Sequence, residues 1–377
     1  MTRLLLLSVF FGLSCAAFAS DPRDEGQRLI EYASGKRAWV SQDEMQLLSE
    51  EAHQVGSCGG FFDVTLWPEA RAEVQKVWTT LDDRVLEPSH PDEVARLFSL
   101  LSRTRYEATI TKMQKYWNRY YSTENAVQAA QWIASQFREV SVGRDDVTVE
   151  LIAHDEWPQP SVIARIRGTD TALEEGIVVG AHEDSINTMV AKPERAAARA
   201  PGADDNASGV AAVLEIFRTF MESGIRPRRD LYFMAYAAEE VGLLGSQAIA
   251  ADFKQRQVKV AAVLNLDMIL FRGATGKMGV TTSNTDSGLN RFSEKLIDRY
   301  VGARRERRSC GYACSDHASW DVNGYRAVFL FEAVGDISPW WHHPNDMLNA
   351  SHEVAWGMNF VKAGAAFMVE LGMMSPF

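Results

Sequence analysis

The stretch Tyr236-Ala237-Ala238-Glu239-Glu240-Val241-Gly242 decides how the rest of the chain is interpreted. It ends an apolar run, 231–238, that has the pattern of a strand buried on both faces. Two adjacent carboxylates at the end of a buried strand have a high desolvation cost unless a cation meets them. The stretch therefore predicts a metal site at the end of a central strand.

Four further segments end an apolar run with a side chain that commonly binds metal ions. They are 178–182, 202–206, 265–268 and 341–342, and they supply His182, Asp205, Asp267 and His342. With the glutamate pair, the segments provide two histidines and three carboxylates, and one glutamate is left over. A lone histidine or aspartate after a strand is usually a turn residue, but repetition at several strand ends indicates a hydrolytic site with two metal ions.

The order of elements predicts an α/β fold. Apolar runs indicate core strands at 177–181, 231–238, 260–266 and 326–331. Helical patterns lie at 108–118, 124–140, 208–222, 245–256 and 286–301, and a last helix closes the chain. Two half-exposed strands, 147–152 and 161–167, are expected to pair antiparallel. The alternation predicts a mostly parallel, twisted sheet sandwiched between helices in three layers, with ligands beyond the carboxyl ends of its strands.

Composition excludes some partners. The chain has 377 residues, 46% of them hydrophobic and 24% charged, enough for one large core or two smaller ones. Its formal net charge of −11 argues against nucleic acid, because phosphate binding needs a basic face. After the first twenty residues no apolar run is long enough to span a bilayer. We expect a monomer with peptide substrates and, in the mature form, no nucleic-acid or membrane partner.

The first 19 residues have the pattern of a signal peptide. Arg3 gives a positive start, 4–13 an apolar stretch, and Ala17-Phe18-Ala19 a cleavage site of small residues. A lipoprotein site at Cys15 is the alternative, but Gly12 stands where an aliphatic residue is expected. We therefore expect transit through the periplasm and release outside the cell.

Residues 20–85 differ from the chain that follows. Segments 25–32 and 42–53 have the pattern of acidic amphipathic helices, and no metal-ligand constellation occurs there. The segment could be a propeptide, a capping subdomain, a separate binding module or extra helices on the main domain. A propeptide would be cleaved between about Pro68 and Pro91 and would mask the site until then. Residues 86–377 are the predicted catalytic domain.

The cysteines suit an oxidising compartment. Cys310 and Cys314 are close enough in sequence to form a tight disulfide, with Gly311 easing the turn. A zinc pair helped by His317 is the alternative, although it lacks a second pair of cysteines. Cys58 is left without an assigned role.

Five stretches resemble one known family. The chain is similar to the secreted bacterial leucyl aminopeptidases of the M28 peptidase family, from about residue 108 to near the C-terminus but not over the first hundred residues. The similar stretches are His182-Glu183-Asp184-Ser185, 201–209, 235–243, Leu266-Asp267-Met268 and 310–320. The resemblance implies the three-layer fold of zinc exopeptidases.

The resemblance also implies the roles of the site residues. His182 and Asp267 would hold one zinc ion and Glu240 and His342 the other, with Asp205 bridging the two ions and Glu239 as the general base. In the family the peptide bond after the bridging aspartate is cis. The family pattern places an aspartate four residues after the last ligand, and Asp346 stands in that relation to His342. The adjacent His343 is then a loop residue, since neighbouring side chains point to opposite sides of an extended segment.

The remaining site residues also follow from the resemblance. Asp184 would orient the imidazole of His182, and Tyr312 would help to hold the substrate oxygen. Met268, Phe331, Trp341 and a Cys310–Cys314 bridge would line the pocket. The implied enzyme is a secreted aminopeptidase with two zinc ions per chain, which removes an apolar, leucine-like residue from the N-terminus of peptides.

Three alternatives stay open from the sequence. A carboxypeptidase of the same family should show a basic residue for the terminal carboxylate, and none stands out near the motifs. A glutaminyl cyclase would need one metal and fewer of these ligands. A non-catalytic binding protein of the same fold would have lost ligands, yet all five are present. One departure concerns the pocket: the segment between Glu332 and His342 is slightly shorter than in similar proteins.

Overall fold

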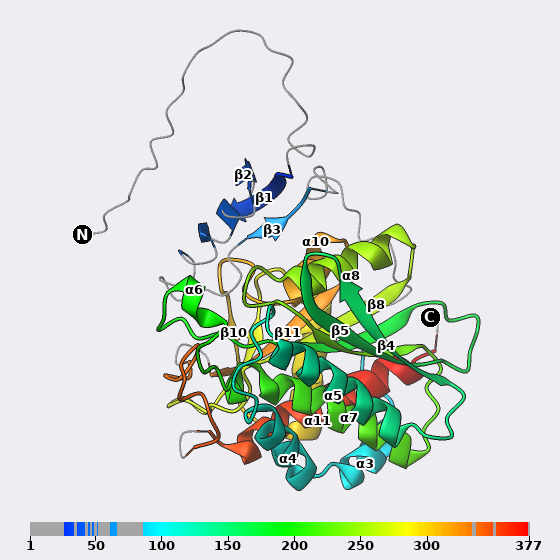
Figure 1. Ribbon diagram of the computed structural model, residues 1–377. Helices are drawn as coiled ribbons and strands as arrows, with labels where there is room; N and C mark the ends of the chain where they lie inside the picture. The colour runs from blue at the N-terminus through cyan, green and yellow to red at the C-terminus, as the bar shows by residue number, and fades with distance from the viewer. Residues whose placement is uncertain are drawn as a thin grey trace.

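The computed structural model describes residues 26–33, 36–41, 44–45, 47–48, 51, 61–65, 86–333, 337–349 and 352–375. Its main body is an eight-stranded sheet covered by helices on both faces (Figure 1). The predicted three-layer α/β architecture is confirmed. Among the described residues, no helix has the length and apolar character needed to cross a membrane. The signal peptide, Cys15 and Cys58 lie outside the described residues.

The sheet has the strand order β10-β9-β11-β8-β6-β7-β5-β4. Its four central strands are parallel to one another: β11 (Ala327–Ala333), β8 (Val260–Asp267), β6 (Gly176–His182) and β7 (Leu231–Tyr236). On one side β5 (Trp157–Ile166) and β4 (Val147–His154) continue it antiparallel, as predicted. On the other side follow the short strands β9 (Met278–Thr281) and β10 (Arg305–Arg308).

The central strands are apolar on both faces because each face meets a helical layer. Alternate residues of β7 show this: Phe233 belongs to the cluster beneath one layer, and Met234 to the cluster beneath the other. The larger layer contains α3 (Pro91–Leu100), α4 (Arg103–Met113), α5 (Glu124–Val140), α7 (Gly209–Ser223), α9 (Ser287–Leu296) and α11 (Val354–Met373). The opposite layer contains α8 (Leu244–Gln255) and α10 (His317–Val322).

The N-terminal segment corrects one prediction. Residues 25–32 were expected to be helical, but Arg28–Ala33 form strand β1, which pairs antiparallel with β2 (Lys36–Val40) and β3 (Phe62–Asp63). β1 pairs mainly with β2, the next segment of the chain, and at two residues with β3, so cross-strand pairing decides the conformation here and not the helical pattern of the single segment. The described residues of the second predicted helix, 44–45, 47–48 and 51, are helical.

Several element boundaries also differ from the predictions. The run 231–238 continues beyond its strand, because β7 ends at Tyr236 and Ala238 takes a positive φ of 54°. The helix expected at 108–118 is α4, which begins at Arg103 and ends at Met113. Strands β9 and β10 were not predicted, since four-residue strands of sequence MGVT and RERR have too little apolar pattern to be recognised.

Candidate active site

Three adjacent strands bring four of the predicted site residues to one edge of the sheet. β6 ends at His182 and β8 ends at Asp267, while Glu239 and Glu240 follow β7. β6 lies between β7 and β8 and runs parallel to both, so the three carboxyl ends lie side by side. The strand-end positions expected from the sequence are therefore neighbours in space.

Asp205 lies between the two histidines. Its Oδ1 is 3.0 Å from Nε2 of His182, and its Oδ2 is 3.1 Å from Nε2 of His342. Each histidine also meets a second carboxylate: Nε2 of His182 is 3.3 Å from Oδ1 of Asp267, and Nε2 of His342 is 2.8 Å from Oε2 of Glu240. The five residues are buried, with relative exposures of 5% or less. The structure thus brings all five predicted ligands together, in two halves joined by Asp205.

The backbone around Asp205 holds it in place. The Asp205–Asn206 peptide bond is cis, as the family resemblance implies. Asp346, fully buried, accepts hydrogen bonds from the backbone N–H groups of Asp204 and Asp205, each at 3.0 Å. The Asn206 side chain donates to the carbonyl of Leu266, one residue before Asp267. These bonds connect the segment that contains Asp205 to the end of β8.

Asp184 connects His182 to the glutamate pair. Its Oδ1 lies 3.3 Å from Nδ1 of His182, which leaves Nε2 directed at Asp205 and Asp267. Asp184 also accepts hydrogen bonds from the backbone N–H groups of Glu239, at 3.0 Å, and Glu240, at 3.1 Å. One buried carboxylate therefore orients both the imidazole and the loop that follows β7.

Glu239 differs from the other carboxylates. Both its oxygens are buried, and the described part of the chain offers neither of them a hydrogen-bond donor. Burial raises the pKa of Glu239 well above its ordinary value, although the charge on His182 opposes that shift. A carboxylate without a partner, aimed into a polar site, is suited to accept and release a proton.

The charges in the cluster shift one another's protonation. Burial and then the charge on Asp205 raise the pKa of Glu240 to about 7. Burial alone would lower the pKa of His342, but Glu240 and Asp205 raise it to about 9. Against the effect of burial, hydrogen bonds from His182 and His342 lower the pKa of Asp205. The raised pKa values of Glu240 and His342 reflect burial and the excess of negative charge in this cluster, which a bound cation would offset.

The two neighbouring histidines point in different directions. His342 has a positive φ of 55° and is 4% exposed, with its ring directed at Asp205 and Glu240. His343 is half-buried, and its Nδ1 accepts a hydrogen bond from the backbone N–H of Asn345 at 3.0 Å. The geometry agrees with the prediction that only His342 belongs to the cluster.

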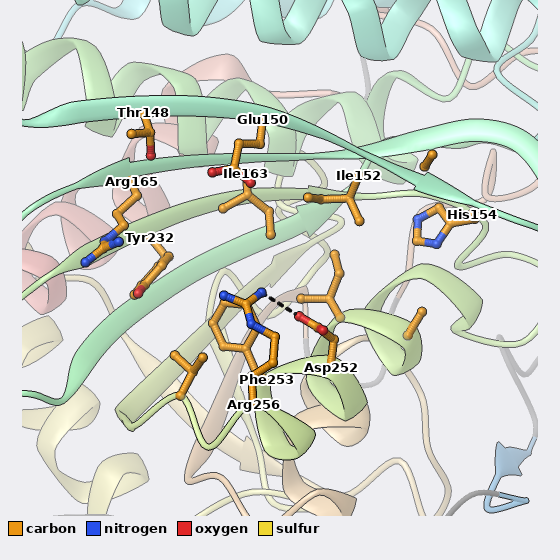
Figure 2. Close-up of a pocket in the computed structure, with 14 residues that line it drawn as sticks. Thr148, Glu150, Ile152, His154, Ile163, Arg165, Tyr232, Asp252, Phe253 and Arg256 are labelled. Carbon is orange, nitrogen blue, oxygen red and sulfur yellow. Dashed lines mark hydrogen bonds and ion pairs between the residues drawn. The ribbon is translucent and has the colours of Figure 1, made fainter.

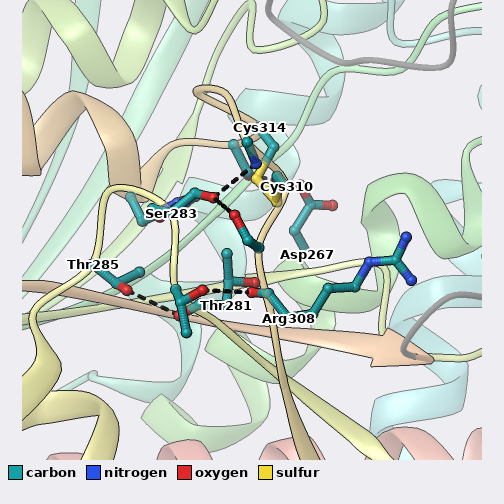
Figure 3. The surroundings of a disulfide bond; sticks show 12 residues. Asp267, Thr281, Ser283, Thr285, Arg308, Cys310 and Cys314 are labelled. Carbon is teal, nitrogen blue, oxygen red and sulfur yellow. Dashed lines mark hydrogen bonds between the residues drawn. A yellow bond between two sulfur atoms is a disulfide. The ribbon is translucent and has the colours of Figure 1, made fainter. Parts of the chain in front are cut away.

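A cavity of about 280 Å³ opens beside the cluster. The pocket residues expected from the family resemblance all border it: Met268, Cys310, Tyr312, Cys314, Phe331 and Trp341. Cys310 and Cys314 form a disulfide, with Cα atoms 6.2 Å apart (Figure 3). The alternative of a zinc pair with His317 is wrong, because His317 stacks on Phe329 and its Nε2 lies 3.1 Å from the carbonyl of Ser283.

A second cavity, of about 320 Å³, lies elsewhere (Figure 2). It is formed by β4, β5, β7 and α8, and none of the predicted site residues lines it. Its Arg256 is paired with Asp252 at 2.9 Å, and Arg165 is paired with Asp230. Both arginines pair with carboxylates of the chain, and His154 is the one histidine among the described residues that line it, so this cavity has no group of histidines and carboxylates comparable to the His182–His342 cluster.

Some supporting residues were not predicted. Ser315 donates to Oδ2 of Asp267 at 2.7 Å and accepts from Asn265 at 2.8 Å. Arg119, fully buried, donates to the carbonyls of Glu183 and Gly202, and so joins the loops that hold His182 and Asp205. Ser315 lies within the motif 310–320, which was a usable signal. Arg119 lies outside every motif, so only the structure reveals it.

Comparison with known proteins decides the family. The model of "Peptidase family M28" matches residues 161–364, a range that contains every predicted ligand. The chain belongs to peptidase family M28. As a member it is a hydrolase and a metallopeptidase, and the predicted enzyme class, an aminopeptidase, is confirmed. The alternative of a non-catalytic binding protein is therefore dropped.

The relatives of this M28 peptidase are named as aminopeptidases. A probable leucine aminopeptidase of Arthroderma benhamiae is 36% identical, over 89% of this chain and 90% of that protein. The crystal structure of the LapA aminopeptidase of Legionella pneumophila has 30% identity and a TM-score of 0.79, covering 93% of this chain and 94% of that one. A zinc aminopeptidase of Bacillus subtilis, 14% identical with a TM-score of 0.60, shows the shared fold alone.

Proposed function

We propose that this M28 peptidase is a secreted aminopeptidase with two zinc ions, which removes apolar, leucine-like residues from the N-terminus of peptides. One observation is central to the proposal. The two oxygens of Asp205 face two different histidines, each of which meets a further carboxylate. A carboxylate shared in this way is what a pair of metal ions requires.

The donor set fits zinc. Imidazole nitrogens and carboxylate oxygens are common zinc ligands, and catalytic zinc sites leave a position open for water or substrate. His182 and Asp267 would hold one ion, Glu240 and His342 the other, and Asp205 both. Oδ1 of Asp267 is buried without a hydrogen-bond donor in the described part of the chain, as expected of a ligand atom. Asp184 would keep Nε2 of His182 available.

Each residue of the site has a separate role in the proposed reaction. When bound, zinc lowers the pKa of water and polarises a carbonyl group. Glu239, which has no hydrogen-bond donor of its own, is placed to accept a proton from the attacking water and to pass it to the leaving amine. Tyr312 borders the cavity and would hold the substrate oxygen. The Glu239 carboxyl stays in position because Asp184 anchors its backbone N–H.

The cavity supports an apolar preference. Met268, Phe331 and Trp341 line it together with the disulfide, and its volume of about 280 Å³ suits one side chain of leucine size. The negative charge of Glu239 and Asp267 beside the metal site would receive the free α-amine of a peptide. The chain is proposed to act as a monomer on peptides, after a signal peptide of residues 1–19 has been removed.

One panel of substrates tests the proposal. Hydrolysis rates on leucyl, phenylalanyl, glycyl and prolyl p-nitroanilides should be highest for the leucyl or phenylalanyl derivative, and metal analysis of the same sample should find two zinc ions per chain. An N-acetylated leucine peptide is the matched control. The proposed aminopeptidase leaves it intact, whereas a carboxypeptidase shortens it from the other end and a glutaminyl cyclase cleaves none of these compounds.

Secretion has a separate test. The mature N-terminus of enzyme collected from the culture medium should begin at or after Ser20. Enzyme that stays in the cell with Met1 still present would contradict export.

A further inference from the structure

The cavity beside the metal-binding cluster has a guanidinium group at its edge. Arg308 is the last residue of β10 and borders the cavity together with Met268, Phe331 and Trp341. Its partner in the register of β9 is Thr281, which borders the same cavity. Figure 3 shows Arg308 beside Thr281, with its side chain extended away from the disulfide.

Arg308 lies three strands away from Asp267, the proposed metal ligand that borders the same cavity. Asp267 belongs to β8, and the strand order from there is β11, β9, β10. Asp267 is level with Glu306 through Phe331 and Gly279, so three strand spacings of ~4.8 Å and two residues along β10 put the backbones of Asp267 and Arg308 roughly 16 Å apart. Between them, Phe329 and Phe331 of β11 border the cavity. A side chain that enters beside the metal site therefore runs over aromatic rings toward Arg308.

Arg308 differs from the other arginines of its strand. Arg305 and Arg307 both pair with Glu294, at 3.2 Å and 2.7 Å. The guanidinium of Arg308 has no hydrogen bond or ion pair with any described residue, and it is exposed. Apart from Asp267, no other aspartate, glutamate, lysine or arginine among the described residues borders the cavity. The N–H donors of Arg308 are therefore available to a substrate.

We propose that Arg308 determines which long side chains this pocket accepts at the N-terminus of a peptide. Glutamine and glutamate are accepted, because their apolar stem lies on the aromatic floor and their terminal oxygen receives a hydrogen bond from the guanidinium. Lysine and arginine are rejected, because they bring a second cation and no acceptor. The proposal rests on the proposed aminopeptidase function and extends its substrate class beyond leucine-like residues.

The expected size of the effect follows from simple electrostatics. In a partly exposed site, a like charge within several ångströms weakens the binding of a side chain by on the order of tenfold relative to a neutral side chain. A hydrogen bond from a charged donor adds a further preference for the acceptor side chain. Glutamine and lysine have similar lengths, so their comparison isolates the charge at the end of the side chain.

The test measures kcat/KM on glutaminyl, lysyl and leucyl p-nitroanilides for the wild type, Arg308→Glu and Arg304→Glu. Arg304 is the matched control: it is exposed, directly precedes β10 and does not border the cavity. Each rate is divided by the rate of the same protein on the leucyl substrate. The wild type should favour glutamine over lysine by on the order of tenfold, Arg308→Glu should reduce or reverse that ratio by a similar factor, and Arg304→Glu should keep the wild-type ratio.

The outcomes separate this inference from the proposed function. Equal glutamine-to-lysine ratios in all three proteins, with leucine hydrolysed, overturn the role of Arg308 alone. If Arg308→Glu is inactive on every substrate, Arg308→Met replaces it, and an unchanged ratio in that variant also overturns the role. A wild type that hydrolyses none of the three substrates overturns the proposed function and the inference with it.

Discussion

One edge of the large sheet carries His182, Asp267 and the Glu239–Glu240 pair and is called the catalytic edge here. The sequence predicts this edge correctly, whereas it predicts the small N-terminal sheet less well. At the catalytic edge, β6, β7 and β8 were predicted, and the side chains at their ends lie together as expected. In the N-terminal segment, β1 was expected to be a helix and proved to be a strand. A strand buried on both faces has a local signature, whereas the short strands of the small sheet depend on cross-strand pairing and packing.

The N-terminal sheet packs against the loop that follows Glu240. Phe62 and Val64 pack with Leu243 and Ala313, and a Cβ atom at Gly242 would lie 2.6 Å from the ring of Phe61. The described residues of the segment therefore contact the loop at Gly242 and Leu243. None of these N-terminal residues borders the cavity at Met268 and Trp341. These described residues therefore support the loop that follows Glu240.

The catalytic edge predicts the largest effect of a single substitution. Glu239→Gln removes the proposed general base and leaves every proposed metal ligand in place, so kcat should fall by on the order of 10²–10⁴. Metal analysis of the purified variant should still find the wild-type zinc content. Turnover near that of the wild type would exclude Glu239 as the base, and zinc loss would make it a ligand.

Substitution of each of the two adjacent histidines tests which of them binds zinc. His342→Ala should lower the zinc content from two ions to about one, since Glu240 and Asp205 would be left to hold the second ion alone. His343→Ala is the matched control and should retain the full content, because the ring of His343 accepts a hydrogen bond from Asn345 in its own loop and has no contact with the cluster among the described residues. The opposite pattern would shift the ligand by one residue and revise the place of Trp341.

Phe61 tests whether the N-terminal segment belongs to the mature enzyme. Its ring is 1% exposed, so Phe61→Ala should lower the free energy of unfolding by about 3 kcal/mol, while Phe61→Leu should cost less. Thermal unfolding and the intact mass of the mature enzyme provide the readouts. A mature chain that begins after Phe61, with unchanged stability, would identify the segment as a propeptide cleaved between about Pro68 and Pro91.

The disulfide should have the smallest effect. Reduction of Cys310–Cys314 frees a short loop, which removes about 2 kcal/mol of stability at most. Because the loop contains Tyr312 and borders the cavity, kcat/KM on the leucyl substrate should fall more clearly than thermal stability. Free-thiol labelling of both cysteines in the mature, unreduced enzyme would show that the bridge is absent.

The same comparison shows what the sequence can reveal about the site. Ligand types and strand-end positions were predictable because burial and strand ends leave a pattern in a few consecutive residues. The hydrogen bonds of Asp346 to Asp204 and Asp205, the joining of two loops by Arg119 and the guanidinium of Arg308 at the cavity were not. The bonds of Asp346 and Arg119 join segments that are far apart in the chain, and Arg308 lies on β10, a short strand that has no apolar pattern.

A zinc titration of the metal-free enzyme tests the central claim most directly. The protein is stripped with a chelator, zinc is added in steps, and both the bound zinc and the leucyl p-nitroanilide activity are measured on each sample. Binding should saturate at two zinc ions per chain, and activity should reach its maximum only as the second site fills. Full activity with a single bound zinc ion, or saturation at one, would contradict a site in which Asp205 joins two metal ions.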